Sequence, residues 1–217
     1  MIQVNASSSK QLQIEDLGLI SYHQAWLYQK QLLQQRLNDA NSTDILLIAE
    51  HNPVYTLGTG STLDNLKFDL KTFTGELYRI ERGGEVTYHC PGQIVAYPIL
   101  NLRHHQQDLH WYLRNLEQVM INLLAIYGVE GKRIQGLTGV WVENEKVGAL
   151  GIKVKRWITM HGFSFNVNCD LAGFKEIIPC GIKDKGVTKL SHFVENVDIV
   201  EVKQNLSEVF KAVFGYE

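Results

Sequence analysis

The order of strand-like and helical patterns is what most constrains the fold of this chain. Short runs of apolar or alternating residues between turn residues outnumber the helical patterns, and the two kinds do not alternate strictly. Strict alternation would favour a doubly wound parallel sheet, so this order favours an α+β fold with a mixed β-sheet. The predicted strands span Ile45–Glu50, Glu76–Glu81, Ile94–Ile99, Val140–Glu143, Lys146–Val154 and Thr159–Val167.

Helical periodicity is clearest over residues 109–127, where apolar residues recur mostly at steps of three and four. Asp108 is the predicted N-cap of this helix, and Gly128 lies just past its end. Less regular patterns predict two more helices, over residues 22–37 and 200–214.

Composition places the chain among ordinary globular proteins, with 45% hydrophobic and 20% charged residues among 217. It contains no repeat, low-complexity tract or linker, which predicts a single domain over residues 1–217. No basic segment precedes an apolar run at the N-terminus, and the apolar runs are too short to cross a bilayer. We therefore expect a cytoplasmic protein that binds no membrane.

The three cysteines are an odd set without a Cys-x-x-Cys pair, which argues against a disulfide framework and against a thiolate zinc site. His89 and Cys90 are neighbours in an extended segment. Their side chains would point to opposite faces and could not both bind one ion. We expect neither a metal nor a cofactor.

Charge is unevenly distributed. The formal net charge is −2, yet residues 146–189 contain eight Lys/Arg and three Asp/Glu, a local balance of +5 (8 − 3). This stretch is either a solvated basic face or a docking surface for an acidic partner. Nucleic acid is not expected, because the basic residues are not interleaved with a stacking platform and the whole chain is slightly acidic.

The segment Arg82–Gln93 reads Arg-Gly-Gly-Glu-Val-Thr-Tyr-His-Cys-Pro-Gly-Gln. Its paired glycines allow close approach of the backbone to an extended substrate. It lacks the Gly-Lys-Ser/Thr ending of a phosphate loop. The alternative is two ordinary turns that flank a strand.

Three further features could carry chemistry. Residues 146–151 combine a lysine with small residues inside a strand, which leaves room on one face, although a β-bulge or close strand packing would explain them equally well. His161 is more often a structural histidine than a catalyst. Cys180 lies between proline and glycine, but a lone cysteine is usually an inert buried residue. Lys146 by itself would be an ordinary solvated lysine.

Taken together, these segments resemble the signature of the lipoyl(octanoyl) transferase family. The resemblance covers about residues 18–190 in the family's order, and Cys180 follows Lys146 by 34 residues (180 − 146), as the family's Cys/Lys dyad requires. Cys90 stands where glycine is common and puts a second thiol beside the predicted pocket; Asn52 stands where proline is common. The matching motifs are Arg82–Gln93, Glu50–Pro53, Tyr55–Gly58, Gly139–Val142, Lys146 with Ala149–Gly151, His161–Phe163, Asn166–Asn168 and Pro179–Gly181.

The resemblance implies the fold of the biotin/lipoate-protein ligase catalytic domain, with a mixed sheet flanked by helices. It implies transfer of an octanoyl group from octanoyl-acyl carrier protein to a lysine ε-amine. The acceptors would be lipoyl domains of 2-oxoacid dehydrogenase E2 subunits and the glycine-cleavage H protein, in the first step of endogenous lipoylation. Cys180 would carry the acyl group as a thioester, and Lys146 would be the acid/base that lowers the pKa of Cys180. The implied substrate-binding positions are Arg82, Gly83, Gly84, Glu85, Val86, Thr87, Tyr88, His89, Ala149, Leu150, Gly151, Gly162, Phe163 and Ser164.

A thiolate suits both halves of such a transfer, because it attacks thioesters well and leaves well. A cysteine is mostly a thiol near pH 7, so a neighbouring ammonium would raise the thiolate fraction. Lysine can then act as a base only if the fold buries it. Burial of the acyl chain, at about 0.8 kcal/mol per methylene, would contribute roughly 5 kcal/mol for an octanoyl tail.

Three alternatives remain from the residues alone. An ATP-dependent lipoate or biotin ligase would need no cysteine. A thioesterase or amidase could pair Cys180 with His89 or His161 and use water as the acceptor. A binding module for acyl carrier protein or lipoyl domains would form no acyl adduct.

Overall fold

The computed structural model of the chain describes residues 11–39, 41–179 and 185–217. Cys180 lies outside the described residues. The helices are α1 (Tyr22–Asn38), α2 (Leu109–Ile126) and α3 (Ile199–Phe214). The strands are β1 (Leu12–Ile20), β2 (Asp44–His51), β3 (Val54–Leu57), β4 (Glu76–Arg79), β5 (Val86–His89), β6 (Gln93–Ile99), β7 (Val140–Val142), β8 (Glu145–Lys155), β9 (Ile158–Asn166) and β10 (Gly186–Val187).

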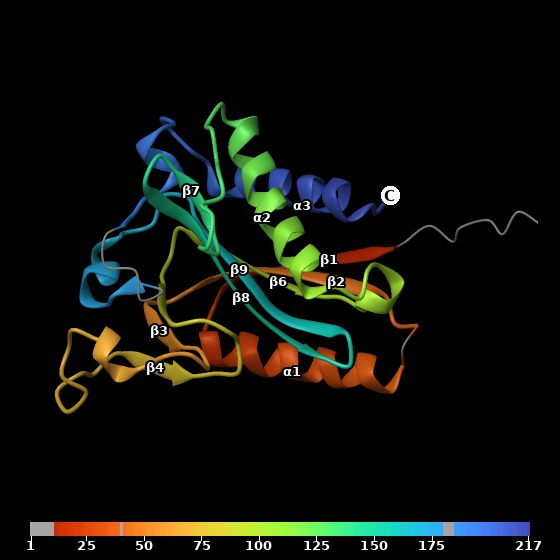
Figure 1. Cartoon of the computed structure of the whole chain (residues 1–217), viewed down its shortest axis with the longest axis horizontal. Helices are drawn as coiled ribbons and strands as arrows, with labels where there is room; N and C mark the ends of the chain where they lie inside the picture. The colour runs from red at the N-terminus through yellow and green to blue at the C-terminus, as the bar shows by residue number, and fades with distance from the viewer. Residues whose placement is uncertain (1–10, 40, 180–184) are drawn as a thin grey trace, which may run out of the picture.

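The main sheet has the strand order β1-β2-β6-β9-β8-β10, with β7 also paired to β8. β1 is parallel to β2 and β10 is parallel to β8, whereas the other pairings in this sheet are antiparallel. A smaller sheet has the order β4-β3-β5 and stands beside the main one (Figure 1). The fold is therefore α+β with a mixed sheet, as the sequence predicts.

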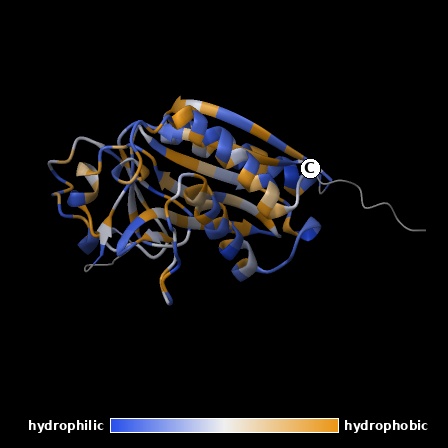
Figure 2. Cartoon of the chain, turned by 90° about the horizontal axis from the view of Figure 1, so that it is seen from above, coloured by the Kyte–Doolittle hydropathy of each residue, from blue (hydrophilic) through white to orange (hydrophobic). Residues whose placement is uncertain are grey.

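Helices cover both faces of the main sheet: α2 and α3 lie on one face, and α1 lies on the other (Figure 1). Alternation along the strands divides the buried residues between these faces. Ile94 and Phe165 pack in the core under α2 and α3, whereas Val95 and Met160 pack against α1. Orange hydrophobic segments are accordingly interrupted by white and blue ones along the strands (Figure 2).

Local signals set the ends of several elements. The Asp108 side chain accepts hydrogen bonds from the backbone N–H groups of His110 and Trp111, at 2.8 and 3.1 Å, and so caps α2 as predicted. The β7–β8 hairpin closes with Val142 opposite Glu145, and Glu143 in the turn has a φ of 52°. Every predicted helix and strand is present, and β4 ends at Arg79 rather than at residue 81.

Sequence patterns missed β1, β3, β5 and β10. β1 is an edge strand in which half-exposed and exposed positions mix without strict alternation. β3 and β5 have four residues each, and all eight are buried, so neither shows an alternating pattern. In the described part of the chain, no helix is both long and apolar enough to cross a membrane.

Candidate active site

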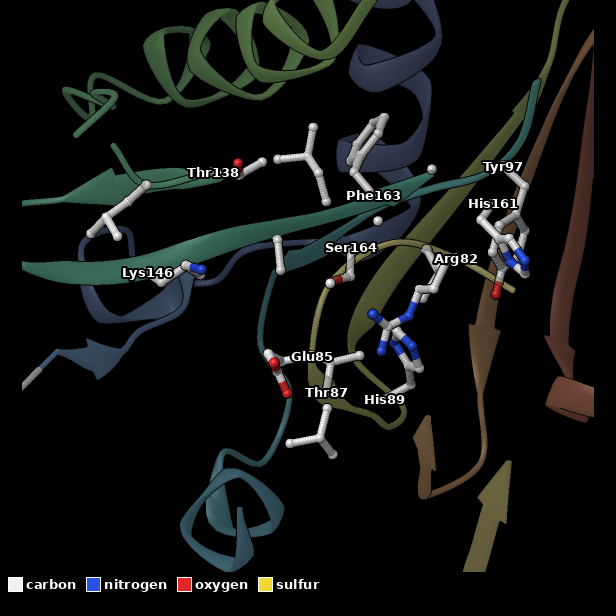
Figure 3. A pocket seen from close by; sticks show the side chains of 18 of the residues that line it. Arg82, Glu85, Thr87, His89, Tyr97, Thr138, Lys146, His161, Phe163 and Ser164 are labelled. Carbon is white, nitrogen blue, oxygen red and sulfur yellow. The ribbon is translucent and has the colours of Figure 1, made fainter. Parts of the chain in front are cut away.

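A cavity of about 260 Å³ lies on the α1 side of the main sheet, over strands β6, β9 and β8. Val95, Ser164 and Ala149 are neighbours across these strands, and their side chains leave the floor open. The segment 82–89 forms the facing wall, so that Arg82 and His89 stand opposite Ser164 (Figure 3). The cavity therefore joins segments that lie far apart in the sequence.

The structure brings most of the predicted site residues to this cavity. Lys146 lines it together with Arg82, Gly84, Glu85, Val86, Thr87, His89, Ala149, Leu150, Gly151, Gly162, Phe163 and Ser164.

Two predicted positions are not on the lining. Gly83 instead donates its backbone N–H to the carbonyl oxygen of Ile152 at 2.9 Å, which ties the wall segment to β8. Tyr88 points away, because side chains alternate along β5. Its ring packs against Tyr55 and Phe174, with ring centres 4.9 and 5.5 Å apart. Gly83 thus has a structural role here, and Tyr88 belongs to the small sheet's own core.

Leu150 and Phe163 border the cavity although their side chains point away from it. Strand alternation places them on the opposite face from Ala149 and Gly162. Their side chains pack in the core beneath α2 and α3, so they support the floor of the cavity from below.

Gly151 and Gly162 pair across β8 and β9. A Cβ on Gly151 would lie 2.9 Å from the carbonyl oxygen of Gly83, and a Cβ on Gly162 would collide with the carbonyl oxygen of Ala96. Backbone therefore occupies the space that these glycines leave. Close strand packing, one of the sequence alternatives, accounts for Gly162, because Ala96 belongs to the neighbouring strand β6. Gly151 instead lets the wall segment cross directly over the sheet.

Lys146 lies at one end of the cavity and is buried, with 6% of its surface exposed. The solvated-lysine interpretation of the sequence is therefore wrong. Trp141 of β7 pairs with Lys146, and Nζ lies 4.8 Å from the centre of its indole ring. Gly139 also allows this arrangement, because a Cβ there would lie 3.1 Å from Cε of the lysine. The hairpin thus folds over Lys146 and shields it.

The opposite end of the cavity holds the guanidinium of Arg82 together with histidine and tyrosine side chains (Figure 3). Burial lowers the pKa of His161 to about 4, although Glu81 opposes this shift from 3.6 Å. Among the described residues, neither ring nitrogen of His161 has a hydrogen-bond partner. Burial lowers the pKa of His89 to about 3. Burial also raises the pKa of Tyr97 well above its usual value. These groups are neutral near pH 7.

A buried hydrogen-bond chain links His89 to the β8–β10 edge of the main sheet. Gln93 accepts from His89 Nδ1 at 2.7 Å and donates to Asn166 Oδ1 at 2.8 Å. Asn166 in turn donates to the carbonyl oxygen of Thr188 at 2.8 Å, and the Thr188 N–H donates to the carbonyl oxygen of Lys146 at 2.9 Å. The Gln93 amide donates elsewhere, so His89 carries its proton on Nδ1. This chain fixes the strand that follows residues 180–184 against β8.

Arg82 is 8% exposed and serves the small sheet. Its Nη2 donates to the backbone carbonyl and to the hydroxyl of Thr56, at 2.8 and 3.0 Å. These bonds hold the wall segment to β3. The guanidinium also lowers the pKa of His89 and of His161.

Sequence reasoning missed several lining residues, namely Tyr22, Val95, Tyr97, Gly136, Leu137 and Thr138. It considered His161 but left that residue out of the site. Alternation within β6 could have placed Val95 and Tyr97 on one face, but nothing in the sequence shows which face is hollow.

The two cysteines among the described residues lie outside this cavity. Cys90, expected beside the pocket, packs instead with Cys169 in the core of the small sheet, with its Sγ 3.4 Å from the carbonyl oxygen of Asp170. Both are free and buried. Within residues 11–39, 41–179 and 185–217, no group of three or more His, Cys, Asp or Glu side chains could hold a metal ion.

Comparisons with known proteins cover nearly the whole chain. The family described as lipoyl protein ligase A/B catalytic domain matches residues 21–211. The octanoyltransferase of a Nostoc species is 52% identical over 217 residues, which are 100% of this chain and 98% of the relative. The octanoyltransferase of Synechococcus elongatus is 54% identical over 197 residues, 91% of this chain and 84% of the relative. A crystal structure of lipoate-protein ligase A bound with ATP matches with a TM-score of 0.74 at 15% identity, covering 97% of this chain and 87% of that one.

Proposed function

This chain belongs to the lipoyl protein ligase A/B catalytic-domain family, and from that premise we propose that it is an octanoyltransferase that uses Cys180 and Lys146. The octanoyl group would come from octanoyl-acyl carrier protein and would pass through a Cys180 thioester. The final acceptor would be a lysine ε-amine on lipoyl domains of 2-oxoacid dehydrogenases or on the glycine-cleavage H protein. The supporting observation is a buried lysine at one end of a cavity sized for an acyl chain.

The volume of the cavity supports a medium-length acyl group. An apolar protein cavity of about 150 Å³ holds the six carbons of benzene. By that ratio, the 260 Å³ here has room for about ten carbons. The far end holds neutral histidine and tyrosine groups and the guanidinium of Arg82, which already donates to Thr56. The reactive carbonyl therefore belongs at the Lys146 end.

Pro179 supports the proposed pairing of Cys180 with Lys146. It borders the same small gap as Lys146, together with Thr87 and Ser164. Pro179 immediately precedes Cys180 in the chain. Pro179, the last described residue before Cys180, therefore lies beside Lys146, which a Cys180/Lys146 dyad requires.

The first half-reaction forms the acyl-enzyme. Lys146 takes the proton of the Cys180 thiol, and the thiolate attacks the thioester carbonyl of the donor. Collapse of the tetrahedral intermediate breaks the carbon–sulfur bond to pantetheine, whose thiolate receives the proton from the Lys146 ammonium.

The second half-reaction forms the amide. The acceptor lysine, as a free amine, attacks the thioester on Cys180, and Lys146 takes a proton from the attacking nitrogen. The thiolate of Cys180 leaves and regains its proton from Lys146. Exclusion of water by the hairpin over Lys146 favours the amine over hydrolysis.

A thioesterase that pairs Cys180 with a histidine fits the structure less well. His161 lies at the opposite end of the cavity from Lys146 (Figure 3). On β9 it pairs with Ile152, six residues along β8 from Lys146, which is about 20 Å at the usual rise of a strand. His89 is held by Gln93 through Nδ1.

Intact-mass spectrometry after incubation with octanoyl-acyl carrier protein tests the proposal. We expect the mass of one octanoyl group on Cys180, its transfer to an apo lipoyl domain, and no adduct on Cys180→Ala. Cys90→Ala is the matched control and should keep the adduct, because Cys90 does not line the cavity. Full activity without any adduct, or activity only with ATP and free octanoate, would replace this proposal with a ligase.

A further inference from the structure

A second cavity, of about 570 Å³, opens beside Pro179. We call it the lysine groove, after Lys67, Lys175 and Lys185 on its lining. Its apolar part is formed by Leu171, Phe174, Ile177, Ile178, Pro179 and Val187. We call the first cavity, over strands β6, β9 and β8, the acyl cavity. It shares no lining residue with the lysine groove, so the groove is a separate feature of the described chain.

A small gap, of about 10 Å³, lies between the two cavities. It borders Thr87, Lys146, Ala149 and Ser164 of the acyl cavity, and it also borders Phe174, Pro179 and Val187 of the lysine groove. Lys146 therefore stands between two compartments. A ligand that reacts at Lys146 and reaches both cavities would pass through this gap.

The charged residues of the groove lie away from this gap. Lys67, Lys175 and Lys185 line the groove but not the gap, and Glu145 is the acidic residue among the groove's described lining. The local balance is +2 (3 − 1). The groove thus has an apolar inner part, next to Lys146, and a cationic outer part.

Backbone pairing builds the outer part of the groove. Leu66 and Ile177 form an antiparallel bridge, and the Lys67 N–H donates to the carbonyl oxygen of Glu176 at 2.9 Å. The Lys67 ammonium donates to the carbonyl oxygen of Lys175 at 3.0 Å. This contact holds Lys67 next to Lys175 without neutralising either charge.

We propose that the lysine groove binds the phosphopantetheine arm of the acyl donor and that Lys67, Lys175 and Lys185 bind its phosphate. This inference rests on the proposed function. The arm has a thiol at one end, a stem of methylenes and amides, and an anionic phosphodiester at the other end. With the thioester at Lys146, the acyl chain fills one cavity, the stem follows the apolar part of the groove, and the phosphate meets the lysines. The acceptor lysine, which has no anionic group on its arm, does not match this charge pattern.

The test compares two small donors, octanoyl-4′-phosphopantetheine and octanoyl-pantetheine, which differ only in the phosphate. For the wild-type protein, we expect a kcat/KM about tenfold higher for the phosphorylated donor. The variant Lys67→Gln/Lys175→Gln/Lys185→Gln should bring this ratio close to one and leave the rate with octanoyl-pantetheine unchanged. The control Lys132→Gln/Lys155→Gln/Lys211→Gln removes the same charge elsewhere and should keep the ratio.

Three outcomes would overturn the inference while the proposed function stands. Wild-type protein could acylate Cys180 equally well from both donors. In the groove variant, kcat/KM could fall to the same degree with both donors while the unfolding temperature is unchanged. It could also raise KM only for the lipoyl-domain acceptor, which would assign the groove to the acceptor. If neither donor, nor octanoyl-acyl carrier protein, acylated Cys180, the proposed function itself would fall.

Discussion

The acyl cavity and the lysine groove meet beside Lys146 but are built from different parts of the fold. Strands β6, β8 and β9 form the floor of the acyl cavity, and its ionisable histidines are buried and neutral. The groove is formed by loops, short turns of helix and the two-residue strand β10, and its lysines reach solvent or lie near it. Regular strands thus shape a slot for a flexible apolar chain, whereas loops present charge.

This difference follows from the cost of burying charge. A charged side chain in a low-dielectric interior loses its hydration, so histidines of the acyl cavity give up their proton instead. Charges at the mouth of the groove keep part of their water and can attract an anion from solution. Among the described residues, Lys146 is the one that combines a cationic residue type with burial at the boundary between the two compartments.

The largest expected effect comes from removing the group at this boundary. Lys146→Ala should slow both half-reactions by about 10²- to 10⁴-fold, because it deletes the proposed acid/base. Single-turnover acylation and deacylation rates measure the two steps separately. Lys153→Ala, on the same strand but outside the acyl cavity, is the matched control and should stay within a few fold of wild type. Near-normal rates in Lys146→Ala, with an unchanged fold, would remove this residue from the mechanism.

The next effect concerns the interior of the acyl cavity. The pKa of His161 is lowered to about 4 and that of His89 to about 3, mainly by burial. In the unfolded chain both would bind a proton near pH 6.5, so below this pH the unfolded state holds more protons than the native state. The free energy of unfolding should therefore fall as the pH drops from about 6.5 towards 4, by roughly 1.4 kcal/mol per pH unit and histidine.

Denaturant unfolding between pH 7.5 and 4.5 checks this expectation. His161→Gln removes one of the titrating groups. It should lower the slope of the free energy of unfolding against pH by the contribution of about one proton. The groove variant should leave the slope as it is, because its lysines lie outside the acyl cavity that holds both histidines. An unchanged slope in His161→Gln would show that the native state binds a proton on this ring as readily as the unfolded state, and the lowered pKa of His161 would be wrong.

Sequence reasoning was sufficient for the elements that carry strong local signals. The periodic helix α2 with its Asp108 cap, and the β7–β8 hairpin with its turn at Glu143, are present where the patterns place them. β3 and β5 escaped because four fully buried residues show neither alternation nor helical periodicity.

The sequence predicted which segments contribute to the candidate site, but not the shape of the cavity or the burial of its residues. Family resemblance picked most of the residues that line the acyl cavity, yet it could not show that Trp141 covers Lys146. It also could not show that Gly151 and Gly162 accommodate backbone rather than a ligand. The burial of a residue and the presence of a cavity depend on pairings between strands that are distant in the sequence, and local patterns do not encode these pairings. The groove escaped for the same reason, since Lys67 is far in sequence from Lys175 and Lys185.

The smallest expected effect is the response of the groove to salt. With octanoyl-acyl carrier protein as the donor, kcat/KM should fall about threefold between 50 and 500 mM salt, because the Debye length shrinks from about 14 Å to about 4 Å over this range. Octanoyl-pantetheine carries no charge and should show little change. The groove variant should flatten the response to the protein donor, whereas the Lys132/Lys155/Lys211 control should retain it. If kcat/KM of the wild-type protein did not change with salt, the three lysines would be part of a solvated basic face. Of the two cavities, only the acyl cavity would then have a role in donor binding.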